Sequence, residues 1–192
     1  MATLNANGSS IAGITNVAPL SKLDGGSVPT WYFPESATDL FLQGEMVCLS
    51  GSAGNAVGLA RPGTDASGYG ILGFAADNAS GSTSSFKGVW LATPDTVFVG
   101  NVGNSATSAL SQTAASDIGQ LYGLTSLSGR TYVDKNKGGA NTSTAMCRVI
   151  GMHDSDVVPS FYGKVKFTVL TNVLQMYNSM YFTASSGVSL KV

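Results

Sequence analysis

The chain has 192 residues, of which 10 are Lys or Arg and 11 are Asp or Glu, so its formal net charge is −1. Charged residues make up 11% of the sequence, whereas an average soluble domain has about a quarter. The excess of basic residues that neutralises a nucleic-acid backbone or an anionic membrane is missing, and we expect binding to neither partner.

The composition also predicts the class of fold. Hydrophobic residues account for 43% of the chain, which is enough for a core, but the 24 glycines and the Ser/Thr tracts argue against a helix-rich enzyme. We predict an all-β protein with a small β-barrel or β-sandwich core, an extended N-terminal arm and a C-terminal β extension. The length fits one domain of ordinary size with appendages.

Two further exclusions follow from the sequence. No stretch approaches 18 uninterrupted apolar residues, and the first residues lack a basic region followed by an apolar run, so we expect neither a membrane span nor an export signal. Cys48 and Cys147 lie in separate apolar runs without a CxxC pair. We expect buried free thiols, because nothing in the sequence argues for the oxidising compartment that a disulfide needs.

Residues 1–35 are predicted to form the N-terminal arm. The first 27 are rich in Ala, Asn, Gly and Ser and cannot build a core alone, so they form either a disordered tail or an arm ordered on a neighbour. The scattered aliphatic residues Leu4, Ile11 and Ile14 favour the arm. Trp31, Tyr32 and Phe33 follow between two prolines, a pattern typical of an edge strand or an extended segment and not of a central strand, and we predict that they contact a partner.

Residues 36–156 are predicted to form the barrel or sandwich core. Short apolar runs alternate there with Gly, Ser, Asn and Asp, which is typical of strands joined by turns. The runs lie at 40–49, 56–61, 69–76, 86–93, 96–102, 120–124, 130–133 and 145–152. The tract 104–116 is expected to be a loop with at most one helical turn.

Two parts of this core resemble each other. In the first part, a predicted strand that starts near Gly44 is followed by a closing strand near Gly73. In the second part, a strand that starts near Gly119 is followed by a closing strand near Gly151. Each glycine would permit a sharp bend of the backbone. Chance similarity between glycine-rich β sequences explains the pattern equally well, so duplication stays an open alternative.

Residues 157–192 are predicted to form a C-terminal strand and an interface segment. The segment KVKFTVL from Lys164 alternates apolar and polar residues, as a half-buried strand does. The uncharged segment that follows is either further core or a subunit interface, since Tyr, Phe and Met are enriched at interface cores. The contact residues predicted here are Met176, Tyr177, Met180, Tyr181 and Phe182.

We find no residues that predict catalysis, a cofactor or a metal site, and we expect a protein that is not an enzyme. His153 stands between turn-forming residues, and neighbouring residues of a turn rarely converge on one site. The GxGxxG pattern at 68–73 is not followed by a plausible helix, so it does not predict nucleotide binding. A carbohydrate-binding or hydrolytic β-sandwich is the alternative of another class, and a cluster of Asp77, Asp154 and Asp156 would favour it.

The region from about Leu40 to Asp156 resembles the cement or decoration proteins of tailed-bacteriophage capsids. The segments that carry the resemblance are QGEMVCLSG, GILGFAADNASG, VWLATPDTVFVGNV, DIGQLYGL and RVIGMHD. The resemblance implies a structural virion protein on the capsid exterior, with a small β-barrel or sandwich, which associates with itself as a homotrimer. Such a protein binds the lattice of the major capsid protein and clamps neighbouring capsomers. A β module of a phage tail or fibre is the alternative with the same composition.

Overall fold

The protein was analysed as a computed structural model that describes residues 16–36, 40–50, 56–59, 70–82, 85–103, 112–127, 129–138, 144–153 and 161–177. These residues are almost entirely in strands and connecting loops, and the 3-10 turns η2 (Ala115–Asp117) and η4 (Thr171–Val173) are short. The prediction of an all-β fold is confirmed. The strands are β1 (Ala18–Lys22), β2 (Thr30–Pro34), β3 (Met46–Ser50), β4 (Ala56–Leu59), β5 (Gly73–Ala75), β6 (Phe86–Leu91), β7 (Thr96–Gly103), β8 (Leu121–Leu127), β9 (Arg130–Gly138), β10 (Cys147–Met152) and β11 (Lys164–Val169).

Five of these strands close into a barrel in the order β7-β11-β10-β8-β9. Neighbouring strands are antiparallel, except that β9 returns to β7 in a parallel pairing through Val102 with Val133 and Gly103 with Asp134. β1 pairs with the first half of β7 and extends this sheet outside the closed ring. Closure leaves the five barrel strands without a free edge along these pairings.

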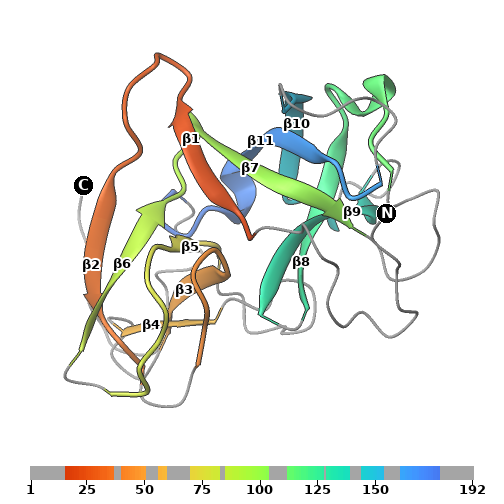
Figure 1. The fold of residues 1–192 in the computed structure, drawn as a ribbon. Helices are drawn as coiled ribbons and strands as arrows, with labels where there is room; N and C mark the ends of the chain where they lie inside the picture. Colours follow the sequence, from red (N-terminus) through yellow and green to blue (C-terminus); the bar gives the residue numbers. More distant parts are fainter. Residues whose placement is uncertain are drawn as a thin grey trace.

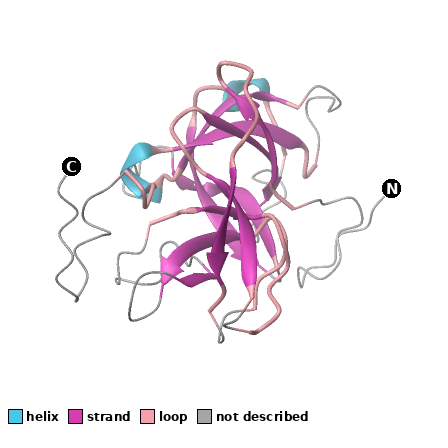
Figure 2. Ribbon diagram, turned by 90° about the vertical axis from the view of Figure 1, so that its left-hand side faces the viewer, coloured by secondary structure: helices cyan, strands magenta, loops and turns pink. Residues whose placement is uncertain are grey.

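The other five strands form a second, wholly antiparallel sheet in the order β2-β6-β5-β3-β4. Figure 1 shows it at the left, orange to yellow-green, beside the green and blue barrel. Figure 2 shows the same two groups of strands from the side. β2 and β4 are the edges of this sheet, which confirms the prediction that Trp31–Phe33 belongs to an edge strand.

One hydrophobic core joins the barrel to the second sheet. Phe74 of β5 lies against Phe98 of β7 and Phe167 of β11, with ring centroids 4.6 and 6.1 Å away. All three side chains are fully buried. A smaller cluster fills the other face of the second sheet, formed by Phe41, Val47, Leu72, Ala75, Val89 and Leu91. The two sheets are therefore parts of one packed unit.

The predicted boundaries at residues 35 and 156 do not coincide with edges of this fold. β11 lies between β7 and β10, so the barrel includes a strand from the predicted C-terminal extension. β1 and β2, from the predicted arm, pair with β7 and β6. Pairing between strands far apart in the sequence sets these boundaries, and the local change in composition on which the prediction rested does not report it.

The chain after β11 also belongs to the fold. Leu174 forms a bridge with Ile71 and is fully buried. The side-chain amide of Gln175 accepts a hydrogen bond of 2.7 Å from the Leu49 N–H and donates one of 2.9 Å to the Leu49 carbonyl. The Gln175 side chain thus makes the two hydrogen bonds with Leu49 that a residue of a neighbouring strand would otherwise make.

The two similar parts of the sequence begin with the same turn. The Glu45 N–H donates a hydrogen bond to the Leu42 carbonyl, and the Gln120 N–H donates one to the Asp117 carbonyl. Both N···O distances are 3.0 Å. The third residues of these turns, Gly44 and Gly119, have φ of 84° and 87°. A positive φ at this position defines a type II turn and favours glycine.

Each turn also contacts the closing strand of its own part in the same way. The Gly44 N–H bonds the carbonyl of Ala75, and the Gly119 N–H bonds the carbonyl of Val149. The second pair of glycines is not equivalent, because Gly73 lies two residues before Ala75 whereas Gly151 lies two residues after Val149. The two parts therefore share a local turn and strand pairing, offset at the second glycine.

Candidate interaction surface

One side of the β2 backbone pairs with β6, and β4, the opposite edge of the same sheet, also lies close to β2. The Leu91 N–H bonds the Pro29 carbonyl and the Glu35 N–H bonds the Ser85 carbonyl, so odd-numbered residues of β2 face β6. In an antiparallel ladder the alternate residues direct their N–H and C=O groups away from the partner. Thr30 and Tyr32 therefore direct theirs to the free edge, where none of the described residues pairs with them.

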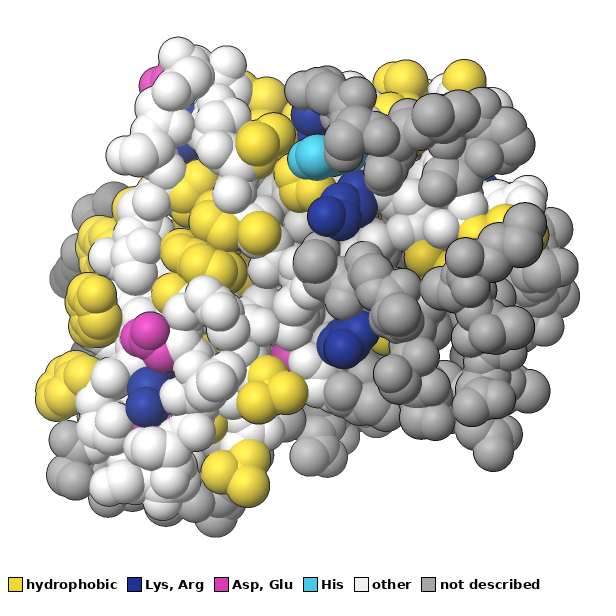
Figure 3. Space-filling model, in the orientation of Figure 1, with side chains coloured by type: hydrophobic (Ala, Val, Ile, Leu, Met, Phe, Trp, Pro, Cys, Tyr) yellow, Lys and Arg dark blue, Asp and Glu magenta, His cyan; other side chains and the backbone are white. Residues whose placement is uncertain are grey.

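The side chains on this strand are large and exposed. Trp31 is 53% exposed and Tyr32 66% exposed, and Phe86 on neighbouring β6 is 63% exposed. Figure 3 shows hydrophobic side chains along the left margin, where Figure 1 places β2, and between that margin and β1. Because successive residues of a strand point to opposite faces, Tyr32 and Phe86 lie on one face of the sheet and Trp31 lies on the other. The edge is therefore apolar on both faces, and exposed apolar groups of this size mark interaction sites more often than small ones do.

Phe33 differs from its two neighbours in the predicted contact triplet. Its side chain is half-buried and packs against the smaller hydrophobic cluster. Phe33 therefore anchors β2 to its own sheet, and Trp31 and Tyr32 carry the exposed surface. Phe86 was placed in a core strand by its sequence, and its exposure follows from pairing with the edge residue Pro34.

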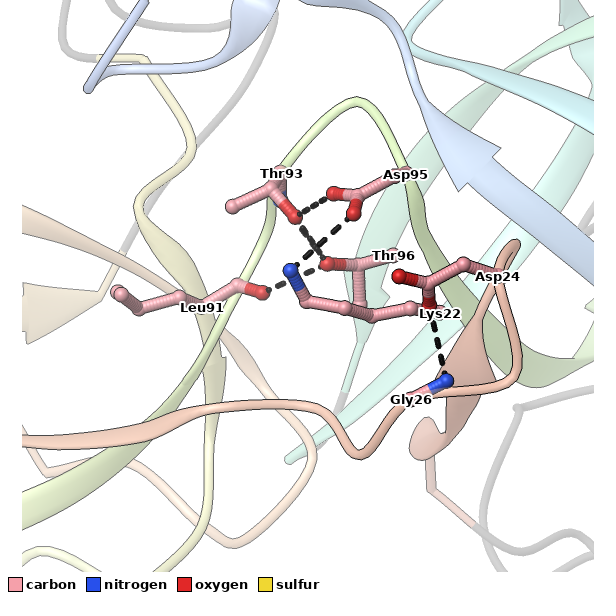
Figure 4. A network of polar contacts seen from close by, with 7 residues as sticks. All are labelled: Lys22, Asp24, Gly26, Leu91, Thr93, Asp95 and Thr96. Atoms are coloured by element: carbon pink, nitrogen blue, oxygen red, sulfur yellow. Dashed lines mark hydrogen bonds and ion pairs between the residues drawn. The ribbon is translucent and has the colours of Figure 1, made fainter.

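A polar network fixes the corner from which β2 emerges (Figure 4). Lys22, at the end of β1, forms an ion pair of 3.1 Å with Asp95 in the turn between β6 and β7. Asp95 also accepts a hydrogen bond from the Thr93 hydroxyl, and its carbonyl accepts one from the Leu23 N–H. These contacts hold the β1–β2 connection against the β6–β7 connection, so the edge strand starts from a fixed point.

The predicted contact residues near the chain ends are only partly described. Met176 is 43% exposed and Tyr177 is 56% exposed, directly after the buried residues Leu174 and Gln175. The remaining predicted residues lie outside the described part of the chain: Leu4, Ile11, Ile14, Met180, Tyr181 and Phe182. The structure thus brings Trp31 and Tyr32 together on one strand, and it places Met176 and Tyr177 on a separate segment.

The barrel contains a buried charged cluster that the sequence reasoning missed. The Asp117 carboxylate lies 2.8 Å from the Lys135 ammonium and accepts hydrogen bonds of 2.7 Å from the Tyr122 hydroxyl and the Ala114 N–H. Lys135 also donates to the Gln112 carbonyl. Burial and the neighbouring carboxylate raise the pKa of the Tyr122 hydroxyl. These contacts tie the turn η2 and the segment before it to β8 and β9.

The second sheet holds its own buried carboxylate, Glu35. It accepts hydrogen bonds from the Ser80 N–H and hydroxyl, at 2.6 and 2.7 Å, and from the Gly81 N–H. Lys87 lies 3.7 Å away. Burial alone would raise the pKa of this carboxyl, but the donated hydrogen bonds and the Lys87 charge outweigh it and lower the pKa below the usual range.

The candidate acidic site of the enzymatic alternative is only partly described. Asp77 is exposed, and its carboxylate accepts a hydrogen bond of 2.8 Å from the Gly88 N–H, which is a structural role at the end of β5. Asp154 and Asp156 lie outside the described residues. The His153 N–H bonds the Lys164 carbonyl and so continues the pairing of β10 with β11.

The free cysteines are placed as predicted. Cys48 and Cys147 are both buried and unbridged, and burial raises the pKa of the Cys147 thiol. Within the described ranges, no three His, Cys, Asp or Glu side chains gather as ligands of a metal ion. The same residues contain no helix with the length and hydrophobicity of a membrane span.

Comparison with known proteins returns no relative of this chain. No family model matches the sequence, and neither the curated proteins nor the solved structures give a match.

Proposed function

We propose that the chain is a structural virion protein that binds the outer surface of an assembled phage capsid and clamps neighbouring capsomers. The observation that carries the proposal is the edge strand β2, with Trp31 and Tyr32 exposed beside backbone groups that can bind a further strand. The resemblance of residues 40–156 to capsid decoration proteins supplies the class of partner, which is the lattice of the major capsid protein. The same resemblance proposes a homotrimer on the capsid exterior.

The physical properties of the surface suit adhesion. Strand addition to a sheet edge binds through main-chain hydrogen bonds, and exposed aromatic side chains add apolar contact area. β2 has no charged residue, so it presents no charge to be desolvated in such a contact. On a lattice, each contact raises the effective concentration for the next, so weak individual contacts are sufficient.

The buried carboxylates that the structure describes fit a scaffold. Two of them, Asp117 and Glu35, accept hydrogen bonds from several donors of the chain, and both lie away from solvent. Their hydrogen bonds hold loops onto the two sheets. The exposed strand is thereby carried on a fixed support, which reduces the entropy lost when it binds.

The test uses purified protein and phage capsids that lack it. We expect the wild-type chain to sediment with the capsids, and the double variant Trp31→Ser/Tyr32→Ser to bind at least about tenfold more weakly, as for loss of an interface hot spot. Ile150→Ser is the matched control. The Ile150 side chain is exposed on barrel strand β10, away from β2, so this variant should bind like wild type.

Two results would contradict the proposal. Absence of the wild-type chain from the capsid pellet would refute capsid binding. Sedimentation with isolated tails instead of heads would identify the tail or fibre module as the correct alternative.

A further inference from the structure

The geometry of β2 points to one particular occupant of its free edge, a second copy of this chain. We propose that two β2 strands pair antiparallel about a two-fold axis that passes between their Trp31 residues. The two five-stranded sheets would then continue across the contact as one sheet. The pairing concerns the isolated protein. It occupies the same edge that the proposed function offers to the capsid, so β2 binds one partner at a time, and its two-fold symmetry makes it a different contact from the one that would build the proposed homotrimer.

The hydrogen-bonding groups of β2 fit this arrangement. Thr30 and Tyr32 both direct an N–H and a C=O outward, because residues 29, 31, 33 and 35 are on the side that faces β6. When Trp31 lies opposite its own copy, Thr30 of each chain lies opposite Tyr32 of the other. Each of these two pairs exchanges two hydrogen bonds. All four outward groups of Thr30 and Tyr32 are then satisfied in both chains.

Proline restricts the alternatives. A shift that places Tyr32 opposite its copy would also place Thr30 opposite Pro34, which has no N–H to give to the Thr30 carbonyl. A shift in the other direction places Thr30 opposite its copy and moves the pairing out of the strand toward Val28. It also separates the two Trp31 side chains, whereas the central pairing brings them face to face.

The side chains favour a second copy as the partner. In the proposed pairing the two Trp31 residues occupy a position without direct hydrogen bonds, where cross-strand side chains come closest and aromatic pairs stabilise a sheet. Residues 25–34 contain no charge, so two copies meet without repulsion. Edge strands are commonly guarded against self-pairing by charged residues, and this one lacks them. Its prolines limit the contact to a few residues.

Cysteine cross-linking tests both the pairing and its register. Under mild oxidation, Trp31→Cys should form a covalent dimer, because residues facing each other in this position have the spacing that a disulfide requires. Thr30→Cys and Tyr32→Cys should each remain uncrosslinked alone and should cross-link when mixed. The native Cys48 and Cys147 are buried and do not compete. Absence of all cross-links would overturn the proposal, as would self-linking of either outer variant at the rate of Trp31→Cys.

A charge exchange provides a second, non-covalent test. Trp31→Lys and Trp31→Glu should each lose the association seen for wild type in sedimentation velocity, because two like charges would meet on the two-fold axis. An equal mixture of the two variants should recover it. A mixture that associates no better than its components would refute the pairing. These measurements contain no capsid, so paired chains that fail to bind capsids would refute the proposed function alone.

Discussion

The barrel and the second sheet differ in how they treat strand edges. The barrel closes on itself through the parallel pairing of β9 with β7, so its five strands satisfy one another. The second sheet keeps β2 and β4 as edges, and β2 exposes Trp31 and Tyr32. The closed part has little backbone to offer a partner, whereas the open part has a short ladder and aromatic side chains. Adhesion is therefore expected at the second sheet.

The comparison does not imply two independent units. The rings of Phe74, Phe98 and Phe167 join the two parts, and Gln175 ties the chain after β11 to β3. An exposed edge strand held this way keeps its geometry without a partner. Substitutions on the two parts test how far the stability of one depends on the other, and Phe98, which packs between them, gives the strongest test.

Phe98→Ala is expected to have the largest effect. Its ring is fully buried between the barrel and the second sheet, and loss of such a side chain costs about 3–5 kcal/mol of unfolding free energy. Urea unfolding followed separately by tryptophan fluorescence and circular dichroism should show one common, weakened transition. Phe86→Ala, on the exposed surface, is the matched control and should change little. Separate transitions in the wild type would show that the two parts unfold independently.

Lys135→Met tests the charged cluster of the barrel. Methionine keeps most of the side-chain length but removes the ammonium that lies 2.8 Å from Asp117, which leaves a buried carboxylate without its cation. Breaking a buried pair in this way costs about 3 kcal/mol. Lys137→Met is the control, because the described hydrogen bond of the Lys137 ammonium goes to the neutral Thr125 hydroxyl and not to a carboxylate. Equal urea midpoints for the two variants would contradict a special role of the Asp117 pair.

The two type II turns provide a direct comparison between the second sheet and the barrel. A methyl group added at Gly44 would meet the Asn16 Cβ and the Val17 carbonyl at 2.6 Å, whereas one added at Gly119 would meet nothing within 4 Å. Gly119→Ala should therefore cost only the positive-φ penalty of about 1 kcal/mol. Gly44→Ala should cost about 3 kcal/mol, because overpacking adds to that penalty. Similar melting temperatures for the two variants would contradict this reading of the turns.

The sequence predicted those features that are set locally. The all-β class followed from the glycine-rich punctuation, and the edge position of β2 followed from its two prolines, since proline cannot donate within a ladder. The alternation of KVKFTVL from Lys164 predicted β11, which ends at Val169, one residue before the end of that segment. Gly44 and Gly119, at the start of the two similar parts, indicated sharp bends of the backbone. Both have a positive φ, a conformation that glycine adopts far more readily than other residues, so it can be predicted locally.

Features that depend on distant partners were beyond the sequence. β11 lies between β7 and β10, and its pairing with β7 joins distant segments, because β7 ends at Gly103 and β11 starts at Lys164, 61 positions later in the sequence. Nothing local in Asp117 or Lys135 signals their ion pair, which forms because strand β9 passes the turn before β8. Alternation puts Phe33 and Trp31 on the same face of β2. Phe33 is half-buried because it packs on the smaller cluster, which strands distant in the sequence form, and the triplet alone does not reveal that cluster.

The smallest predicted effect concerns pH and two glutamates of the second sheet. Hydrogen bonds from Ser80 and Gly81 and the Lys87 charge lower the pKa of Glu35 against the effect of burial, whereas burial raises the pKa of Glu45 and outweighs the hydrogen bond from the Leu42 N–H. The stabilisation from Glu35 is present above the ordinary glutamate pKa and is lost as the pH falls through the lowered value. The contribution of Glu45 has the opposite sign and is lost as the pH rises through the raised value.

Single glutamine substitutions separate these two contributions. Glu35→Gln should cost about 1.5 kcal/mol at neutral pH, as expected for loss of hydrogen bonds to a charged group, and the cost should shrink below the ordinary glutamate pKa. Glu45→Gln should become more favourable relative to wild type as the pH rises through the acidic range. The measurement is the urea midpoint of each variant at a series of pH values from 3 to 7, a range that brackets ordinary carboxyl pKa values of about 4. If the urea midpoints of the two variants, relative to wild type, changed with pH in the same direction, the opposite signs of the two pKa shifts would be contradicted.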